Sequence, residues 1–302
     1  MPVHELEQHP YLNYYTQFRS NIESDYYKGI IVGSFPIYAV TDSINMDLEI
    51  TIKRFTVDGT MRFFYGSRKS DLWKYVGLAL VNIDPRKNGI GAFEKPDIAV
   101  ENCKQLLFQN KLLISDSLYR TNRTDQSADD SGLMVSSEID YVNQLKTVNY
   151  ALKNQLQENI GIESIYFTST SMGAKSPYGW FLKIFDGTIS ISNQFKVGVR
   201  TWSAIAKIDF GDGDVRQYNI FFLPTPKPRG IHWKLKRTIM FENFLRTIHP
   251  HFYYEVDPIP AGLLNSNQES QLSDLRVAFL TECYRQAIVF KKLNFDGSNG
   301  ML

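Results

Sequence analysis

The sequence predicts an α/β fold, a three-layer α/β/α sandwich with a short central parallel sheet plus β-hairpin insertions. Four short apolar runs recur along the chain, each typical of a parallel strand that is covered on both faces. Helical segments lie between these runs, and alternation of strands and helices favours a parallel sheet between layers of helices. The four predicted strands are residues 28–35, 111–115, 164–168 and 218–223.

The first strand is the clearest, because the aliphatic residues Ile30, Ile31 and Val32 follow one another directly. Among the helices, residues 138–157 carry apolar side chains at spacings of three and four, with Ser137 placed as an N-cap. The same periodicity predicts a final amphipathic helix over residues 270–293.

Two stretches interrupt the alternation and predict β insertions near residues 46–64 and 186–217. The first alternates polar and apolar residues around an Asp58-Gly59 hairpin turn, and the second is also strand-like. From residue 238 to residue 302 we expect a helical extension. We find no repeat or linker, so residues 1–302 are interpreted as a single domain.

Composition limits the function classes. Lysine and arginine exceed aspartate and glutamate by one, so a polyanion would have to bind a local basic patch. Two cysteines exclude a four-cysteine metal or iron–sulfur site within the chain and give no disulfide framework, as in a reducing compartment. No apolar run is long enough for a membrane span, and the start of the chain lacks a signal-peptide core. We expect a cytoplasmic monomer with no membrane contact.

The ends of the predicted strands are the expected site, because open parallel sheets bind ligands at the carboxyl ends of their strands. All four strand ends are polar or rich in proline. The glycine patterns of dinucleotide-binding folds and P-loops are absent, as is the Gly-x-Ser-x-Gly turn of hydrolases. The five histidines show no metal-binding spacing.

Taken in order, the strand-end segments resemble the uracil-DNA glycosylase superfamily, and they are closest to its hypoxanthine- and mismatch-specific branches. The turn Gly33-Ser34-Phe35-Pro36 is similar to the first motif of the superfamily. The segment from Tyr65 to Trp73 is similar to the aromatic-Gly-x-Pro-Arg-Asn-x-Phe-Trp motif of those branches. Further similar segments are Ile114-Ser-Asp-Ser117 with the following Arg/Ser/Asp loop, and Leu223-Pro-Thr-Pro-Lys-Pro228.

The resemblance implies a monofunctional DNA glycosylase that acts on DNA and needs no metal or other cofactor. Such an enzyme flips a nucleotide into its pocket and hydrolyses the N-glycosidic bond of the base. The transition state resembles an oxocarbenium ion, so the protein must orient a water, stabilise the positive sugar and donate hydrogen bonds to the leaving base.

The catalytic positions depart from the family pattern. Where the first motif carries Asp or Asn, this chain has Phe35, and where the second motif carries Asn it has Ser70. Asp42 and Asp71, together with Ser70, are therefore our candidates for orienting water or stabilising the sugar cation. Alternatively, Asp42 is a helix N-cap, and Asp71 is a solvated loop carboxylate or the cap of the helix that carries Trp73.

The resemblance also places a base-binding set. Tyr65 matches the aromatic residue that stacks on the extruded base, and the alternative is a core tyrosine. Asp116 could accept from an exocyclic amine such as that of cytosine or adenine, which uracil lacks. A structural aspartate bonded to backbone N–H groups is the alternative for Asp116. The complete set is Gly33, Ser34, Phe35, Pro36, Tyr65 and Asp116.

DNA contacts are expected from two segments. After the third strand, Ser169, Ser171 and Lys175 could bind phosphate at a helix N-terminus. After the fourth strand, a Pro-rich loop opens a basic run, for which a merely solvated face is the alternative. The residues of that loop in the predicted interface are Thr225, Lys227 and Arg229.

Several functions remain open at this point. A glycosylase could repair deaminated or mismatched bases, or it could remove hypermodified bases from foreign DNA. Phe35, Asp116 and the β insertions favour the second of these, since all three would reshape the pocket. The missing Asp/Asn motivates a non-catalytic nucleic-acid-binding protein of the same fold. The fold class alone would also suit a nucleotide-handling enzyme.

Overall fold

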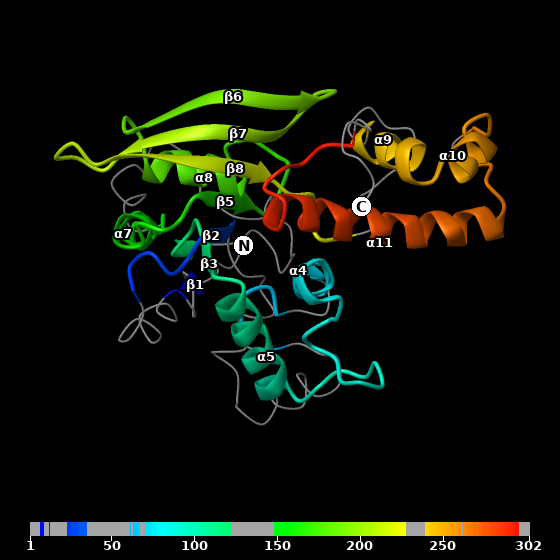
Figure 1. Cartoon of the computed structure of the whole chain (residues 1–302), viewed down its shortest axis with the longest axis horizontal. Helices are drawn as coiled ribbons and strands as arrows, with labels where there is room; N and C mark the ends of the chain where they lie inside the picture. The colour runs from blue at the N-terminus through cyan, green and yellow to red at the C-terminus, as the bar shows by residue number, and fades with distance from the viewer. Residues whose placement is uncertain are drawn as a thin grey trace, which may run out of the picture.

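The computed structural model describes residues 7–8, 12, 23–34, 61, 63–66, 70–121, 148–227, 239–260 and 262–295. Seven helices and eight strands fall within these ranges (Figure 1). The strands are β1 (Glu7–Gln8), β2 (Gly29–Gly33), β3 (Leu112–Asp116), β4 (Arg120–Thr121), β5 (Ser164–Phe167), β6 (Ile189–Val197), β7 (Arg200–Asp209) and β8 (Val215–Phe222). The helices are α4 (Leu72–Val81), α5 (Pro96–Gln109), α7 (Ala151–Glu158), α8 (Pro177–Ile184), α9 (Ile239–Ile248), α10 (Pro250–Val256) and α11 (Ser266–Ile288).

A six-stranded mixed sheet forms the centre of the fold, in the order β3-β2-β5-β8-β7-β6. The first four of these strands pair in parallel, whereas β7 pairs antiparallel with both β8 and β6. The four parallel strands lie on the four predicted apolar runs, so the predicted α/β class is confirmed. The small β1–β4 ladder is a separate two-stranded sheet.

The strand order contains a reversal. After β2 the chain goes to β3 on one side of β2, and it then crosses to β5 on the other side. The loops that follow β2 and β5 therefore separate at the carboxyl edge of the sheet, which is where ligands bind in folds of this kind.

Two hydrophobic clusters cover the two faces of the sheet, as a three-layer sandwich requires. Ile31 and Tyr166 pack into the first cluster, with side chains from α4, α5, α9, α10 and α11. Ile30 and Ile165 pack into the second, with side chains from α7 and α8. Adjacent strand residues point to opposite faces, so an uninterrupted apolar run is what a strand buried on both sides needs.

The predicted insertion at residues 186–217 is a β-hairpin that widens the sheet. In β7 the alternate residues Ala204, Ala206 and Ile208 pack into the second cluster, and the residues between them are more exposed. The hairpin therefore extends one edge of the sheet and keeps one solvated face. Figure 1 shows β6 as the outer strand of this extension.

The helical predictions need one correction. Residues 138–147 and Ser137 lie outside the described residues, but the chain at 148–150 is not helical. Val148 forms an antiparallel bridge with Leu118, and α7 begins only at Ala151. The apolar spacing at Val148 therefore reflects a β-bridge contact and not a helix face.

The C-terminal extension is helical as predicted. Its last helix, α11, begins four residues before the predicted start, behind a capping box in which Asn265 and Gln268 bond each other's backbone N–H groups. Among the described residues, no helix has the length and apolar character needed to cross a membrane.

The other predicted insertion, at residues 46–64, lies mostly outside the described residues. Its described end is not a strand, because the Met61 N–H donates to Gly66 O at 2.6 Å and the Gly66 N–H donates to Phe63 O at 3.0 Å.

Candidate functional site

The carboxyl ends of β2, β3 and β5 meet at the reversal in the sheet. Gly33 ends β2 and Asp116 ends β3, and the two residues are paired in the sheet register. Thr168 directly follows β5, and its N–H donates to Val32 O at 3.2 Å. Parallel pairing thus places these three residues side by side on one edge.

Tyr65 reaches this edge from the loop before α4. Its backbone is left-handed, with φ at 53°, a conformation that is uncommon for residues other than glycine. A side chain on the next residue, Gly66, would come within 1.9 Å of Met61 O, so glycine is required there. The loop is also anchored from α4, because Trp73 Nε1 donates to Phe64 O at 2.6 Å.

The Tyr65 hydroxyl lies against both neighbouring strand ends. It shares a hydrogen bond of 2.9 Å with Thr168 Oγ1. A Cβ at Gly33 would lie only 1.7 Å from Tyr65 Oη and 2.2 Å from Asp116 Oδ1. The two oxygens therefore crowd the bare Cα of Gly33, and no larger residue fits at this position without displacing them.

Asp116 is held from behind by its neighbours. Asp116 is only 1% exposed. Asn149 Nδ2 donates to Asp116 O at 2.8 Å and to Ser115 Oγ at 3.2 Å, and the Asn149 N–H donates to Ser117 O at 2.9 Å. Asn149 therefore fixes the backbone of the β3 end and leaves the aspartate carboxylate directed at Gly33.

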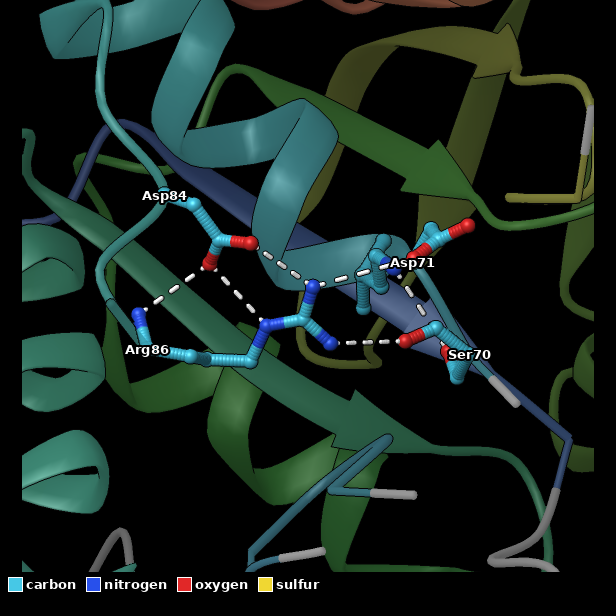
Figure 2. Close-up of polar contacts among 5 residues, drawn as sticks. Ser70, Asp71, Asp84 and Arg86 are labelled. Carbon is cyan, nitrogen blue, oxygen red and sulfur yellow. Dashed lines mark hydrogen bonds and ion pairs between the residues drawn. The ribbon is translucent and has the colours of Figure 1, made fainter. Parts of the chain in front are cut away.

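A second polar cluster surrounds the start of α4 (Figure 2). The guanidinium of Arg86 forms a two-point contact with Asp84, with Nε–Oδ1 at 3.0 Å and Nη2–Oδ2 at 2.8 Å. Its Nη1 donates to Ser70 O at 2.9 Å, and its Nη2 lies 3.7 Å from Asp71 Oδ1. The Arg86 side chain is 4% exposed, so this is a buried ion pair with a second carboxylate at its rim.

Burial and charge act in opposite directions on Arg86. Burial lowers its pKa, but the hydrogen bond and charge of Asp84, with a smaller contribution from Asp71, raise the pKa above its usual value. The guanidinium therefore stays charged. Burial also raises the pKa of the nearby Tyr75 hydroxyl and of the Cys103 thiol, so both stay protonated.

Asp71 is the more exposed carboxylate of this cluster, at 32%. It occupies the N-cap position of α4, yet its side chain makes no capping hydrogen bond. Its N–H donates to Pro226 O at 3.2 Å, which joins it to the loop after β8. The alternative prediction, in which the Asp71 side chain caps α4, is therefore wrong.

Ser70 does not present its hydroxyl to solvent, as a catalytic group would. It is buried, and its hydroxyl accepts from the Leu72 N–H at a long 3.5 Å. Figure 2 shows Ser70 and Asp71 side by side on the segment that enters α4. Ser70 therefore acts on the geometry of that entry, through its carbonyl contact with Arg86.

The loop after β8 is fixed between two helices. Besides the Asp71 contact to Pro226, Tyr284 of α11 donates to Pro224 O at 3.2 Å. Thr225 and Lys227 are exposed beside these anchored prolines, as an interface would require.

The loop after β5 presents its predicted residues to solvent to different degrees. Ser169 is half-buried, whereas Ser171 and Lys175 are exposed. Thr170, between the two serines, is buried and accepts a hydrogen bond from Arg200 Nη1 of β7. The capping of α8 falls to Ser176, whose Oγ accepts from the Gly179 N–H at 3.0 Å.

Part of the predicted set cannot be placed. Phe35, Pro36, Asp42 and Arg229 lie outside the described residues. Ser34 is described and buried directly after β2. Among the residues that are described, no group of histidine, cysteine, aspartate and glutamate side chains could hold a metal ion.

Sequence reasoning missed Thr168, Arg86 and Asn149. Thr168 closes a predicted strand, and its place at a strand end was a usable signal. Arg86 and Asn149 gave no such signal, because their roles depend on partners far away in the chain.

No protein-family model, curated protein or solved structure matches this chain.

Proposed function

We propose that this protein is a DNA glycosylase that hydrolyses the N-glycosidic bond of a flipped damaged, deaminated or modified base. The observation that carries the proposal is the meeting of Tyr65, Gly33 and Asp116 at the reversal of the sheet. These residues come from three of the segments on which the resemblance to the uracil-DNA glycosylase superfamily rests. A left-handed tyrosine packed against a bare glycine is a costly arrangement, and such arrangements concentrate at functional sites.

Each of these three residues has a separate role in base recognition. The Tyr65 ring is partly buried against the first hydrophobic cluster, and it supplies an aromatic wall for the extruded base. The Asp116 carboxylate accepts from an exocyclic amine on the base edge, which favours a base other than uracil. Gly33, which has no side chain, leaves room for the Tyr65 and Asp116 oxygens to lie together at this edge.

Asp71 is the described carboxylate that best suits the hydrolytic step. It is half-exposed, makes no capping bond and is oriented by Arg86. In the proposed reaction Asp71 holds the water that attacks C1′ and takes its proton, while the base leaves with the electron pair of the broken bond. The negative charge of Asp71 also stabilises the positive sugar in the transition state.

The test is an excision assay on single-stranded and duplex oligonucleotides. They carry uracil, hypoxanthine, xanthine, thymine mismatches and hypermodified pyrimidines, and alkali cleaves the abasic products. We expect strand breaks with at least one base, lost in Tyr65→Ala and reduced about 10²- to 10⁴-fold in Asp71→Asn. The matched control is Asp186→Asn, because Asp186 is exposed just beyond the far end of α8.

The outcomes separate the candidate functions. Breaks confined to hypermodified bases would indicate a defence glycosylase, and breaks at deaminated bases a repair enzyme. DNA binding without breaks across the whole panel would overturn the glycosylase in favour of a non-catalytic binding protein. The buried Ser70, in place of the usual Asn, is the observation that favours this second candidate. Absence of both binding and breaks would overturn both.

A further inference from the structure

We propose that Arg200 binds a DNA phosphate beside the flipped nucleotide, so that the β6–β7 hairpin is part of the site. This inference rests on the proposed function and deepens it. Arg200 is not among the residues that the sequence predicts for the site, because it stands in an insertion that the family pattern lacks.

Strand direction places Arg200 on the correct edge of the sheet. β7 is antiparallel to both β8 and β6, so β6 runs in the same direction as β8 and the other parallel strands. The turn after β6 therefore lies on the carboxyl edge, the edge that carries Gly33, Asp116 and Thr168. Arg200 is the first residue of β7 and pairs with Val197 across this turn. Figure 1 shows β6 and β8 pointing the same way.

A direct contact ties Arg200 to the loop of the site. Its Nη1 donates to Thr170 Oγ1, and Thr170 is buried two residues after Thr168, which bonds the Tyr65 hydroxyl. The contact holds the arginine against the loop after β5. Arg200 is only half-buried, so part of the residue is accessible from solvent.

The chemistry of this position suits a phosphate. A guanidinium presents a planar fork of N–H donors that matches phosphate oxygens, and pre-organisation lowers the entropy lost on binding. Lys175, exposed on the loop after β5 that Arg200 contacts, carries a further positive charge. The chain has a net charge of only +1, so phosphate contacts must come from local groupings such as this one.

The tip of the hairpin supports the same assignment. Gly198 has φ at 61°, and Val199, between it and Arg200, is 78% exposed. An exposed apolar side chain at the end of the hairpin, next to Arg200 in the chain, suits contact with the base of a nucleotide whose phosphate Arg200 binds.

The experiment compares Arg200→Ala, Arg200→Lys and Lys207→Ala in the full chain. Lys207 lies on the same strand and is exposed, about 23 Å away at the strand rise of about 3.3 Å per residue. Its variant removes the same charge far from the carboxyl edge. Binding to a short duplex that carries the excised base is measured by fluorescence anisotropy across a range of KCl concentrations, and excision is measured in parallel.

We expect Arg200→Ala to weaken binding about tenfold and to reduce the slope of log Kd against log salt by about 0.9. Arg200→Lys keeps the charge and should retain most of the slope but not the full affinity, because it loses the fork. Lys207→Ala should match the wild type. Thermal unfolding of each variant shows whether a loss of DNA binding comes from misfolding. If Arg200→Ala is misfolded, the affinity and salt slope of Arg200→Lys test the inference instead.

An Arg200→Ala protein that is folded and keeps the wild-type slope would overturn the inference while leaving the glycosylase intact. Equal losses in Arg200→Ala and Lys207→Ala would also overturn it, since they would indicate a diffuse effect of charge. A wild-type protein that neither binds nor cleaves DNA would overturn the proposed function, and this inference with it.

Discussion

Replacing Gly33 by alanine tests the assembly of the candidate site with one methyl group. The new Cβ would lie 1.7 Å from Tyr65 Oη, 2.6 Å from Tyr65 Cζ and 2.2 Å from Asp116 Oδ1. All three distances are too short for contact between atoms, so at least one of the two side chains must move. Gly33 is not among the glycines with positive φ, so alanine adds a steric conflict without backbone strain.

The cost follows from what has to move. If Tyr65 swings away, its hydrogen bond to Thr168 is lost, which costs about 1 kcal/mol. Overpacking of a tight site typically adds about 1–3 kcal/mol. We therefore expect Gly33→Ala to lower the free energy of unfolding by about 2–4 kcal/mol, as measured by urea denaturation, and to abolish excision even where the protein stays folded.

Two comparisons make the result specific. In the Gly33→Ala/Tyr65→Phe double variant the closest clashing atom is absent, so part of the stability should return. Gly89→Ala is the matched control, since a Cβ there would meet nothing within 4 Å. It should be neutral or stabilising by up to about 1 kcal/mol. If Gly33→Ala unfolded with the wild-type midpoint and slope, the close packing of Tyr65 and Asp116 on Gly33 would be refuted.

Two further predictions concern buried charge and pH. Arg86→Met should lower the free energy of unfolding by about 3–5 kcal/mol in urea denaturation, because it leaves the Asp84 carboxylate buried without its cation. The Asp84→Asn/Arg86→Met double variant should recover part of that loss, and an additive loss would contradict the pairing. Burial raises the pKa of Tyr218 to about 12 from a usual 10, so its stabilising contribution is complete below pH 10 and is lost as pH rises from 10 through 12. Tyr218→Phe should make unfolding less sensitive to pH in that interval, and an unchanged pH profile would show that Tyr218 does not titrate as its burial requires.

The sequence was sufficient to predict the parallel part of the sheet, because strands buried on both faces must be apolar throughout. It also predicted the hairpin of β6 and β7, whose alternation reflects one buried and one solvated face. It was wrong at Val148, where apolar spacing was read as a helix face although the residue pairs with Leu118. Local periodicity cannot distinguish these two situations, because the bridge partner lies far away in the chain.

The candidate site was predictable only where it coincides with strand ends. Asp116 follows from its place at the end of a strand, and the resemblance pointed to Tyr65. The role of Arg86 could not be predicted, because a lone arginine after Asp84-Pro85 has the appearance of a solvated loop. Its contacts with Ser70 and Asp71 join residues that are 15 or more positions away and form only in the folded chain.

The contacts that fix the loop after β8 between α4 and α11 have a consequence for the order of folding during biosynthesis. Pro226 accepts from Asp71 near the start of α4, and Pro224 accepts from Tyr284 near the end of α11. Every proposed site residue is thus translated well before the helix that secures this loop. A nascent chain that has not yet exposed α11 would hold the parallel strands but not the fixed loop, so full function should be acquired as a late step of folding.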